Sequence, residues 1–171
     1  MSTLDDVYRR VREHVGTVER DRLGRVRARD FQRFAVAAGE SDPLYFDDGA
    51  AHAAGLPGAV APPLYASSLL GWDAGPAEDE LRPDGTAGEE VAGLPLAGLR
   101  LMGAGQDIDF HSPVCDGADV VRETSIEDVV LKNGRSGPFL VITLLRAFQD
   151  EAGTPLLTCR ENFIARPQAS R

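Results

Sequence analysis

The sequence contains few cysteines, lysines and histidines. Its two cysteines, Cys115 and Cys159, are far apart and lie in strand-like contexts, which fits free thiols better than a disulfide framework or a metal site. Lys132 is the single lysine beside 17 arginines, and three histidines occur in 171 residues. We expect a protein with neither a bound metal nor a cofactor.

Long apolar runs and an excess of positive charge are also lacking. The longest stretch without Asp, Glu, Lys or Arg, residues 49–72, is broken by glycines and prolines and does not suit a membrane span. The N-terminus alternates charges, unlike a secretory signal. A net charge of −9 disfavours binding to the phosphate backbone of nucleic acid. We therefore expect a single domain over residues 1–171, cytoplasmic, with neither membrane nor nucleic acid as a partner.

The N-terminal part predicts two helices and a strand. Apolar residues three and four positions apart indicate a short amphipathic helix within residues 3–14. Residues 22–28 have the composition of a first strand. Asp30 suits the start of a second helix and Gly39 its end, because aspartate favours helix N-termini and glycine favours the left-handed conformation that follows many helices.

Residues 39–65, GESDPLYFDDGAAHAAGLPGAVAPPLY, have the layout of a catalytic loop that leads into a buried helix. No histidine stands in the first part of this loop, where acid–base chemistry would need one. A short helix should follow within residues 46–55, capped by Asp47 or Asp48 and ending at Gly55.

Two prolines then suit the first turn of another helix, which should run through Leu69, Leu70 and Trp72. This helix is apolar almost all round, so we expect it to be buried. The next residues, about 73–97, are rich in Ala, Gly, Pro, Asp and Glu without a hydrophobic period, and predict a long acidic loop. A solvated insertion is the simpler interpretation, and a lid or partner-docking segment stays open.

From residue 98 onward the pattern is that of strands. The turn sequences NGRSG at residues 133–137 and DEAG at residues 150–153 separate β-rich runs and predict about four antiparallel strands. Residues 139–148, FLVITLLRAF, are apolar on both faces and should form a central strand that is covered on both sides. The element order predicts an α+β fold in which a bent antiparallel sheet wraps around one long buried helix.

Several motifs, in this order, resemble the FAS1-like dehydratases of the MaoC group. They are AGESDPLYFD, GLPGAVAPPLY, FHSPVCDGADV and DEAGTPLLTCRENFIAR, and the resemblance covers roughly residues 15–166. It implies a hotdog fold and a substrate that is an acyl thioester of coenzyme A or of an acyl carrier protein. The reaction it implies is hydration of enoyl thioesters or dehydration of 3-hydroxyacyl thioesters.

Catalytic members of the wider group carry the loop G-D-x-N-P-x-H, whose Asp and His face the thioester across a dimer interface. The resemblance places Glu40 at the Asp position, Asp42 at the Asn position and Tyr45 at the His position, so these three are the catalytic candidates. A phenol has an unperturbed pKa of about 10 and is a poor base at neutral pH. Glu40 would then be the base and Tyr45 the acid, while Asp42 is equally well explained as a residue that orders the loop.

The start of the buried helix departs from the family pattern too. Where many catalytic members read H-G-M, this chain has Ala61, Pro62 and Pro63, and proline has no N–H with which to polarise the thioester carbonyl. A donor would have to come from Leu64 or Tyr65, further into the first turn.

The resemblance implies a substrate-binding set around this turn, namely Gly58, Ala61, Pro62, Leu64, Tyr65 and His52. Structural interpretations stay open for Tyr65 as a core residue, Gly58 as a turn residue and His52 as a surface histidine. His111, in DFHSPV, is an alternative base, although a histidine at a strand end before a proline is more often structural or exposed.

Both departures are typical of a subunit that binds the acyl chain while a MaoC-type partner supplies Asp and His. We predict a hydro-lyase component of fatty-acid or polyketide metabolism that works as such a heterodimer. The alternatives are a self-sufficient homodimer that uses Glu40 with Tyr45 or a histidine from elsewhere, a catalytically silent thioester-binding scaffold, and, last, a hotdog thioesterase. A homodimer or heterodimer is expected because the hotdog sheet usually continues across a two-fold interface.

Overall fold

The computed structural model describes residues 4–68, 77–81, 91 and 93–167. Its helical elements are α1 (Leu4–Arg12), α2 (Ala28–Ala38), the 3-10 helix η1 (Pro43–Tyr45), α3 (Asp48–Ala53), α4 (Tyr65–Ser68) and the 3-10 helix η2 (Glu78–Glu80). Its strands are β1 (Val18–Arg25), β2 (Leu99–Phe110), β3 (Asp119–Gly134), β4 (Gly137–Asp150) and β5 (Pro155–Pro167).

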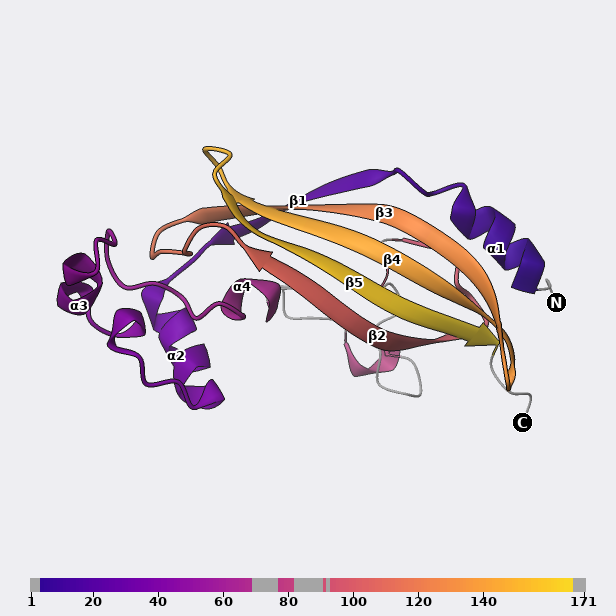
Figure 1. Ribbon diagram of the computed structural model, residues 1–171, viewed down its shortest axis with the longest axis horizontal. Helices are drawn as coiled ribbons and strands as arrows, with labels where there is room; N and C mark the ends of the chain where they lie inside the picture. Colours follow the sequence, from indigo (N-terminus) through magenta and orange to yellow (C-terminus); the bar gives the residue numbers. More distant parts are fainter. Residues whose placement is uncertain (1–3, 69–76, 82–90, 92, 168–171) are drawn as a thin grey trace.

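The five strands form one antiparallel sheet in the order β1-β3-β4-β5-β2. Tight turns join β3 to β4 after Gly134 and β4 to β5 after Asp150, so the turns predicted from NGRSG and DEAG are confirmed. The strands are long and curved, with α2 and α3 at one end of the sheet and α1 near the other (Figure 1). The antiparallel strands predicted after residue 98 are confirmed as β2 to β5.

Strand β4 lies at the centre of the sheet, as its sequence predicts. Leu140, Ile142 and Leu144 on one face of the strand are fully buried. Val141 and Leu145 on the opposite face are only half-buried, because successive side chains of a strand point to opposite faces. The prediction that β4 is covered on both faces is therefore wrong for the single chain, because one face stays half-buried.

Helix α1 lies near the right-hand part of β3 in Figure 1, and β1 runs along the first half of β3, with which it pairs from Asp119 to Ser125. Helix α1 buries Val7 and Val11, which confirms the amphipathic helix, and it packs against β3 and β4. Strand β1 spans Val18–Arg25 and not residues 22–28, since its pairing with β3 already begins where Val18 lies opposite Ser125.

Helix α2 ends where the sequence predicts but starts two residues earlier. Gly39 follows the helix with a φ of 76°, the left-handed conformation expected of a C-terminal glycine. The helix begins at Ala28 and not at Asp30, and the side chain of Arg27 at the N-cap makes no capping hydrogen bond. Instead the backbone N–H of Ala28 donates to Oδ1 of Asp116 at 2.7 Å. The cap therefore comes from a distant part of the chain.

Helix α4 begins after the two prolines and not at them. The backbone N–H of Tyr65, its first residue, donates to the carbonyl of Pro62 at 2.9 Å. The prolines therefore form the turn that precedes the helix. The predicted continuation of this helix through residues 69–72 lies outside the described residues.

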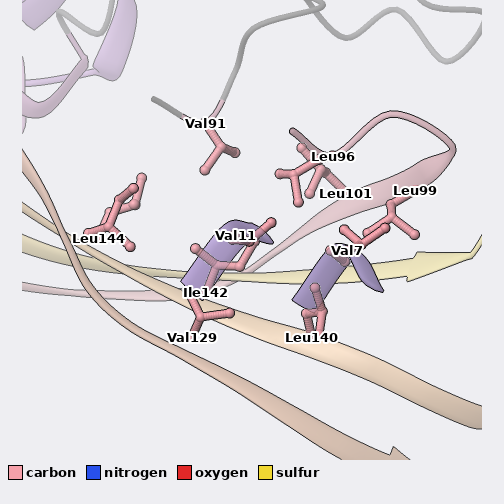
Figure 2. Packing of buried hydrophobic residues seen from close by; sticks show 12 residues of the cluster. Val7, Val11, Val91, Leu96, Leu99, Leu101, Val129, Leu140, Ile142 and Leu144 are labelled. Atoms are coloured by element: carbon pink, nitrogen blue, oxygen red, sulfur yellow. The ribbon is translucent and has the colours of Figure 1, made fainter. Parts of the chain in front are cut away.

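The buried side chains form two apolar clusters on the same face of the sheet. The first core cluster, shown in Figure 2, comprises Val7, Val11, Val91, Leu96, Leu99, Leu101, Ile126, Val129, Leu140, Ile142, Leu144 and Ala165. The second core cluster comprises Val26, Phe31, Ala59, Ala61, Tyr65, Ala66, Val114, Val120, Phe148, Leu156, Leu157 and Cys159. The second cluster joins α2, the turn before α4 and the ends of the strands, so it holds the predicted site loop against the sheet.

The end of the predicted acidic loop contributes to the core. Val91 and Leu96 are 3% and 4% exposed and belong to the first core cluster, with Leu94 partly buried against it. The short helix η2 lies near the start of the same segment. These residues therefore depart from the expected solvated insertion, because three apolar side chains anchor its end to the sheet.

Among the described residues, no helix has both the length and the apolar character that crossing a membrane would require.

Candidate active site

The loop after α2 is built by local hydrogen bonds. The carboxylate of Asp42 accepts from the backbone N–H of Leu44 at 3.0 Å and caps helix η1. The side-chain amide of Gln32 on α2 donates to the carbonyl of Tyr45 at 3.3 Å. Of the two interpretations of Asp42, the capping role is thus visible in the structure. These contacts fix where Tyr45 stands relative to α2.

The environment of Tyr45 keeps its phenol protonated. Its side chain is half-buried, and burial raises the pKa of Tyr45 above its usual value, with the carboxylates of Glu40 and Asp42 raising the pKa further. Both causes act in the same direction, because a phenolate is an anion that loses hydration on burial and is repelled by nearby negative charge. Tyr45 can therefore donate a proton at neutral pH, and only its rare phenolate form can act as a base.

Tyr45 opens onto a cavity of about 350 Å³. The cavity is lined by Leu44, Tyr45, Val60, Ala61, Pro62, Pro63, Phe110, His111, Ser112, Pro113, Val114, Leu156 and Leu157. Its walls thus come from η1, the turn before α4, the segment after β2 and the start of β5. The volume falls within the range of small-molecule sites, and the mostly apolar lining suits an acyl group.

Three of the predicted site residues, Tyr45, Ala61 and Pro62, line this cavity. Backbone hydrogen bonds hold its wall in place: the N–H of Val60 donates to Leu44 at 3.0 Å and that of Ala61 to Val114 at 2.7 Å. The turn before α4 is therefore tied both to the site loop and to the segment that follows β2.

The two predicted carboxylates stand back from the cavity. Glu40 and Asp42 are exposed and do not line it, although their charges act on Tyr45. Glu40 therefore lies close enough to tune the phenol, while a substrate in the cavity would meet Tyr45 first.

The two proposed backbone donors differ in what they can offer. The N–H of Tyr65 is already bonded to Pro62, which removes it as a donor to a substrate. Leu64 is 56% exposed, and no hydrogen bond from its N–H is recorded within the described part of the chain. Tyr65 itself is buried and packs edge-to-face on Phe31 and Phe34, so the core interpretation of its side chain is confirmed.

The remaining predicted residues lie within residues 47–58, in α3 and the turn that follows it. Asp47 caps α3 by accepting from Ala50 at 2.9 Å, which decides between the two predicted caps, and Asp48 accepts from Ala59 at 2.8 Å. A Cβ at Gly58 would lie 3.3 Å from Oδ1 of Asp48, so close approach to that carboxylate, and not a positive φ, explains this glycine.

His52 also lies in this segment. It is exposed, and its Nε2 is 3.0 Å from the carbonyl of Pro57. Gly58 and His52 do not line the cavity. These observations agree with the interpretation of His52 as a surface histidine, in the segment that precedes the cavity wall.

His111 is the main residue that the predicted site set omits. It follows β2 directly, lines the cavity with Tyr45, and donates its backbone N–H to Leu156 at 2.9 Å. Ser112 beside it lines the cavity as well. The motif FHSPV drew attention to His111, but only the antiparallel pairing of β2 with β5 brings this strand end to the site loop.

The cysteines are free thiols, as predicted, with Cys115 half-buried and Cys159 buried. Burial raises the pKa of both thiols, which disfavours the reactive thiolate. Within residues 4–68, 77–81, 91 and 93–167, no three His, Cys, Asp or Glu side chains gather as a metal site would require.

The sheet, its strand order and its neighbours define the chain as a hotdog-fold protein. Two solved structures with this architecture are complexes from Mycobacterium tuberculosis. The ChsH1-ChsH2 complex has a TM-score of 0.68 at 20% identity, over 98% of this chain and 93% of that chain. The HadBC (3R-hydroxyacyl-ACP dehydratase) complex has a TM-score of 0.61 at 17% identity, over 88% of this chain and 96% of that chain.

The family model of the FAS1-like dehydratase domain region matches residues 13–159, and the chain belongs to this family. A relative from Thermomonospora curvata, named "Probable enoyl-CoA hydratase alpha subunit", is 27% identical over 168 residues. The alignment covers 94% of this chain and 52% of that relative, so the chain spans about half the length of this relative. The resemblance found in the motifs is thereby confirmed.

Proposed function

We propose that this chain is a component of an acyl-thioester hydratase or dehydratase that works with a second, MaoC-type hotdog subunit. The reaction would be the addition of water to an enoyl thioester of coenzyme A or of an acyl carrier protein, or its reversal. The observation that carries the proposal is Tyr45, a protonated phenol that lines the cavity, at the loop position where the motif resemblance implies a histidine in catalytic relatives. A loop without that imidazole needs a base from elsewhere.

The cavity supports the thioester as substrate. Its lining is mostly apolar, with Leu44, Val60 and Leu157 among the walls, and an acyl group gains free energy by leaving water for such a surface. Tyr45 supplies a proton donor at one wall. A site of this kind can bind the acyl part of a thioester and present its reacting carbons to a phenol.

The names of similar proteins support a two-subunit assembly. The relative from Thermomonospora curvata is called an alpha subunit, and both structural neighbours are complexes of two different chains. In the proposed assembly this chain binds the acyl group, and the partner carries the Asp and His of the G-D-x-N-P-x-H loop. The partner subunit accounts for most of the rate.

The edge of the sheet offers a place for such a partner. Strand β2 is the last strand in the sheet order, and most of its residues are exposed. An edge strand presents unpaired backbone groups that a second chain can pair with. Continuation of the sheet across β2 would also bring the partner close to His111, which follows β2 directly.

The test is a pairing assay. Hydration of a short-chain enoyl-coenzyme A is measured with this chain alone, with a MaoC-type hotdog subunit from the same organism alone, and with the two together. We expect the pair to be at least about a hundredfold faster than either chain, since general acid–base groups contribute about 10² to 10⁴ in rate. Replacement of the partner's loop Asp or His should remove that gain. Pairs that bind but give no gain in rate would overturn the proposal.

A further inference from the structure

The cavity contains its own set of polar side chains. Of the residues that line it, Tyr45, His111 and Ser112 have polar side chains, and the others are apolar or proline. Tyr45 and His111 are the two whose side chains can take part in acid–base catalysis. One acid and one base in a small, mostly apolar cavity are sufficient for general acid–base catalysis on a bound substrate.

The ring of His111 is held in place but keeps one nitrogen open. Its Nε2 lies 3.2 Å from the hydroxyl oxygen of Thr158 on β5, and its backbone N–H donates to Leu156. Among the described residues, none forms a hydrogen bond with Nδ1. When Nε2 donates to Thr158, Nδ1 is the unprotonated nitrogen and can accept a proton. The residue is exposed enough for a substrate to reach it.

We propose that His111 and Tyr45 are the base and the acid of a reaction centre that belongs to this chain itself. In the dehydration direction, Nδ1 of His111 takes a proton from C2 of a 3-hydroxyacyl thioester. The electron pair of that bond forms the C2–C3 double bond, and the bond from C3 to the hydroxyl oxygen breaks. The departing hydroxyl takes the phenol proton of Tyr45 and leaves as water.

The cycle closes without another reagent. The products are an enoyl thioester and water, with an imidazolium at His111 and a phenolate at Tyr45, and a proton passed from the first to the second through solvent restores both groups. Ser112 lines the same cavity and in this scheme donates its hydroxyl to the thioester carbonyl, which gains negative charge when C2 loses its proton. This role matters because the neighbouring prolines have no N–H, Tyr65 has already used its own, and Leu64 does not line the cavity.

The inference rests on the proposed thioester substrate and does not depend on the partner. Glu40 is not the base in this scheme, because it stands outside the cavity while His111 lines it. In an assembly with a MaoC-type subunit, the partner carries the faster centre and this chain a second, slower one.

The test uses the purified chain alone and an enoyl-coenzyme A substrate, on which the two groups act in reverse. The phenolate of Tyr45 takes a proton from the water that bonds to C3, and the imidazolium of His111 gives a proton to C2. The wild type should hydrate it slowly but measurably, and His111→Gln and Tyr45→Phe should each lower kcat by at least about a hundredfold. Added imidazole should restore part of the activity of His111→Ala, which a merely structural role of the histidine would not allow. The same substitutions at residues outside the cavity, His14→Gln and Tyr8→Phe, should leave the rate unchanged, and thermal unfolding checks that every variant folds.

Each outcome separates this inference from the proposed function. If the chain alone is inactive while the pair is active, or if His111→Gln retains full activity, the second centre is refuted and the two-subunit enzyme stands. If the chain alone is active and loses activity with His111, the inference is supported whatever the partner does. If no combination of chains hydrates any enoyl thioester, both proposals fail.

Discussion

Arg146 on β4 and Glu161 on β5 form a buried ion pair between the two core clusters. Their residues are 6% and 7% exposed, and Gln106 on β2 donates to Oε1 of Glu161 at 2.9 Å. Burial lowers the pKa of Arg146, and the nearby charge of Arg122 lowers the pKa further. Two charges thus lie on the inward face of the sheet, where the neighbouring side chains along β4, Leu144 and Phe148, are apolar.

Removing one partner of this pair should destabilise the protein strongly. Glu161→Gln leaves the buried guanidinium of Arg146 without a countercharge, and breaking a buried pair in this way costs about 3–5 kcal/mol. Urea unfolding measures the loss. The double variant Arg146→Met/Glu161→Leu removes both charges and should recover most of it. A double variant as unstable as the single one would show that the charges themselves hold the core together.

An exposed ion pair provides the matched control. Arg160 contacts Glu127 through two hydrogen bonds of 2.6 and 2.8 Å, but both side chains are exposed to solvent, at 46% and 38%. Glu127→Gln should therefore change the free energy of unfolding far less than Glu161→Gln, because solvent screens an exposed pair.

Glu40 should act on the site through the pKa of Tyr45. Negative charge near a phenol raises its pKa, so Glu40→Gln should lower the pKa of Tyr45 toward the ordinary value. The acid form of Tyr45 is needed for dehydration, and it is present below that pKa and lost above it. In a plot of the dehydration rate against pH, the fall in rate at alkaline pH should therefore move to lower pH in Glu40→Gln. Carbon-13 tyrosine NMR measures the pKa directly, and an unmoved pKa would contradict the electrostatic coupling.

The cap of α2 by Asp116 should contribute to stability. Asp116→Ala removes the acceptor of the Ala28 N–H at the start of the helix, and loss of such a cap costs about 1 kcal/mol. Asp116→Asn keeps an acceptor oxygen and should retain most of the stability. Equal losses in the two variants, measured by urea unfolding, would argue that the charge and not the hydrogen bond matters.

Phe110 should contribute to acyl binding without supporting the fold. It lines the cavity and is 51% exposed, so Phe110→Ala removes apolar surface from the site and little from the core. We expect about a tenfold weaker affinity for an acyl-coenzyme A, roughly 1.4 kcal/mol, with an unchanged unfolding temperature. Val36, 69% exposed on α2 and outside the cavity, provides the control substitution Val36→Ala. Calorimetric titration measures both, and equal affinities in the two variants would contradict the assignment of the cavity.

Local chemistry made much of the fold predictable. The turns NGRSG and DEAG, the helix end at Gly39 and the cap of α3 all depend on residues that are neighbours in sequence. The start of α2 was mispredicted because its cap is Asp116, far away in the chain. The burial of Val91 and Leu96 was not predicted for a similar reason. Two apolar side chains in an acidic segment do not form a hydrophobic periodicity that would indicate a helix or a strand.

The candidate site was predictable only where a single loop carries it. Tyr45 could be found from its motif, and it does line the cavity. His111 lies more than sixty positions away. It reaches the same cavity because β2 pairs with β5 and the segment after β2 is hydrogen-bonded to the turn before α4. Motif spacing within one loop cannot predict which distant residues lie beside that loop, because the tertiary structure determines those contacts.

We propose that this chain belongs to an enzyme that adds water to enoyl thioesters, with the acyl group bound in the cavity beside Tyr45. The most direct measurement is the rate of hydration of a short-chain enoyl-coenzyme A by the purified protein, with and without a MaoC-type partner. We predict slow turnover alone and at least about a hundredfold faster turnover in the pair. Saturable binding of the thioester without hydration in either condition would contradict the claim and identify a silent binding protein.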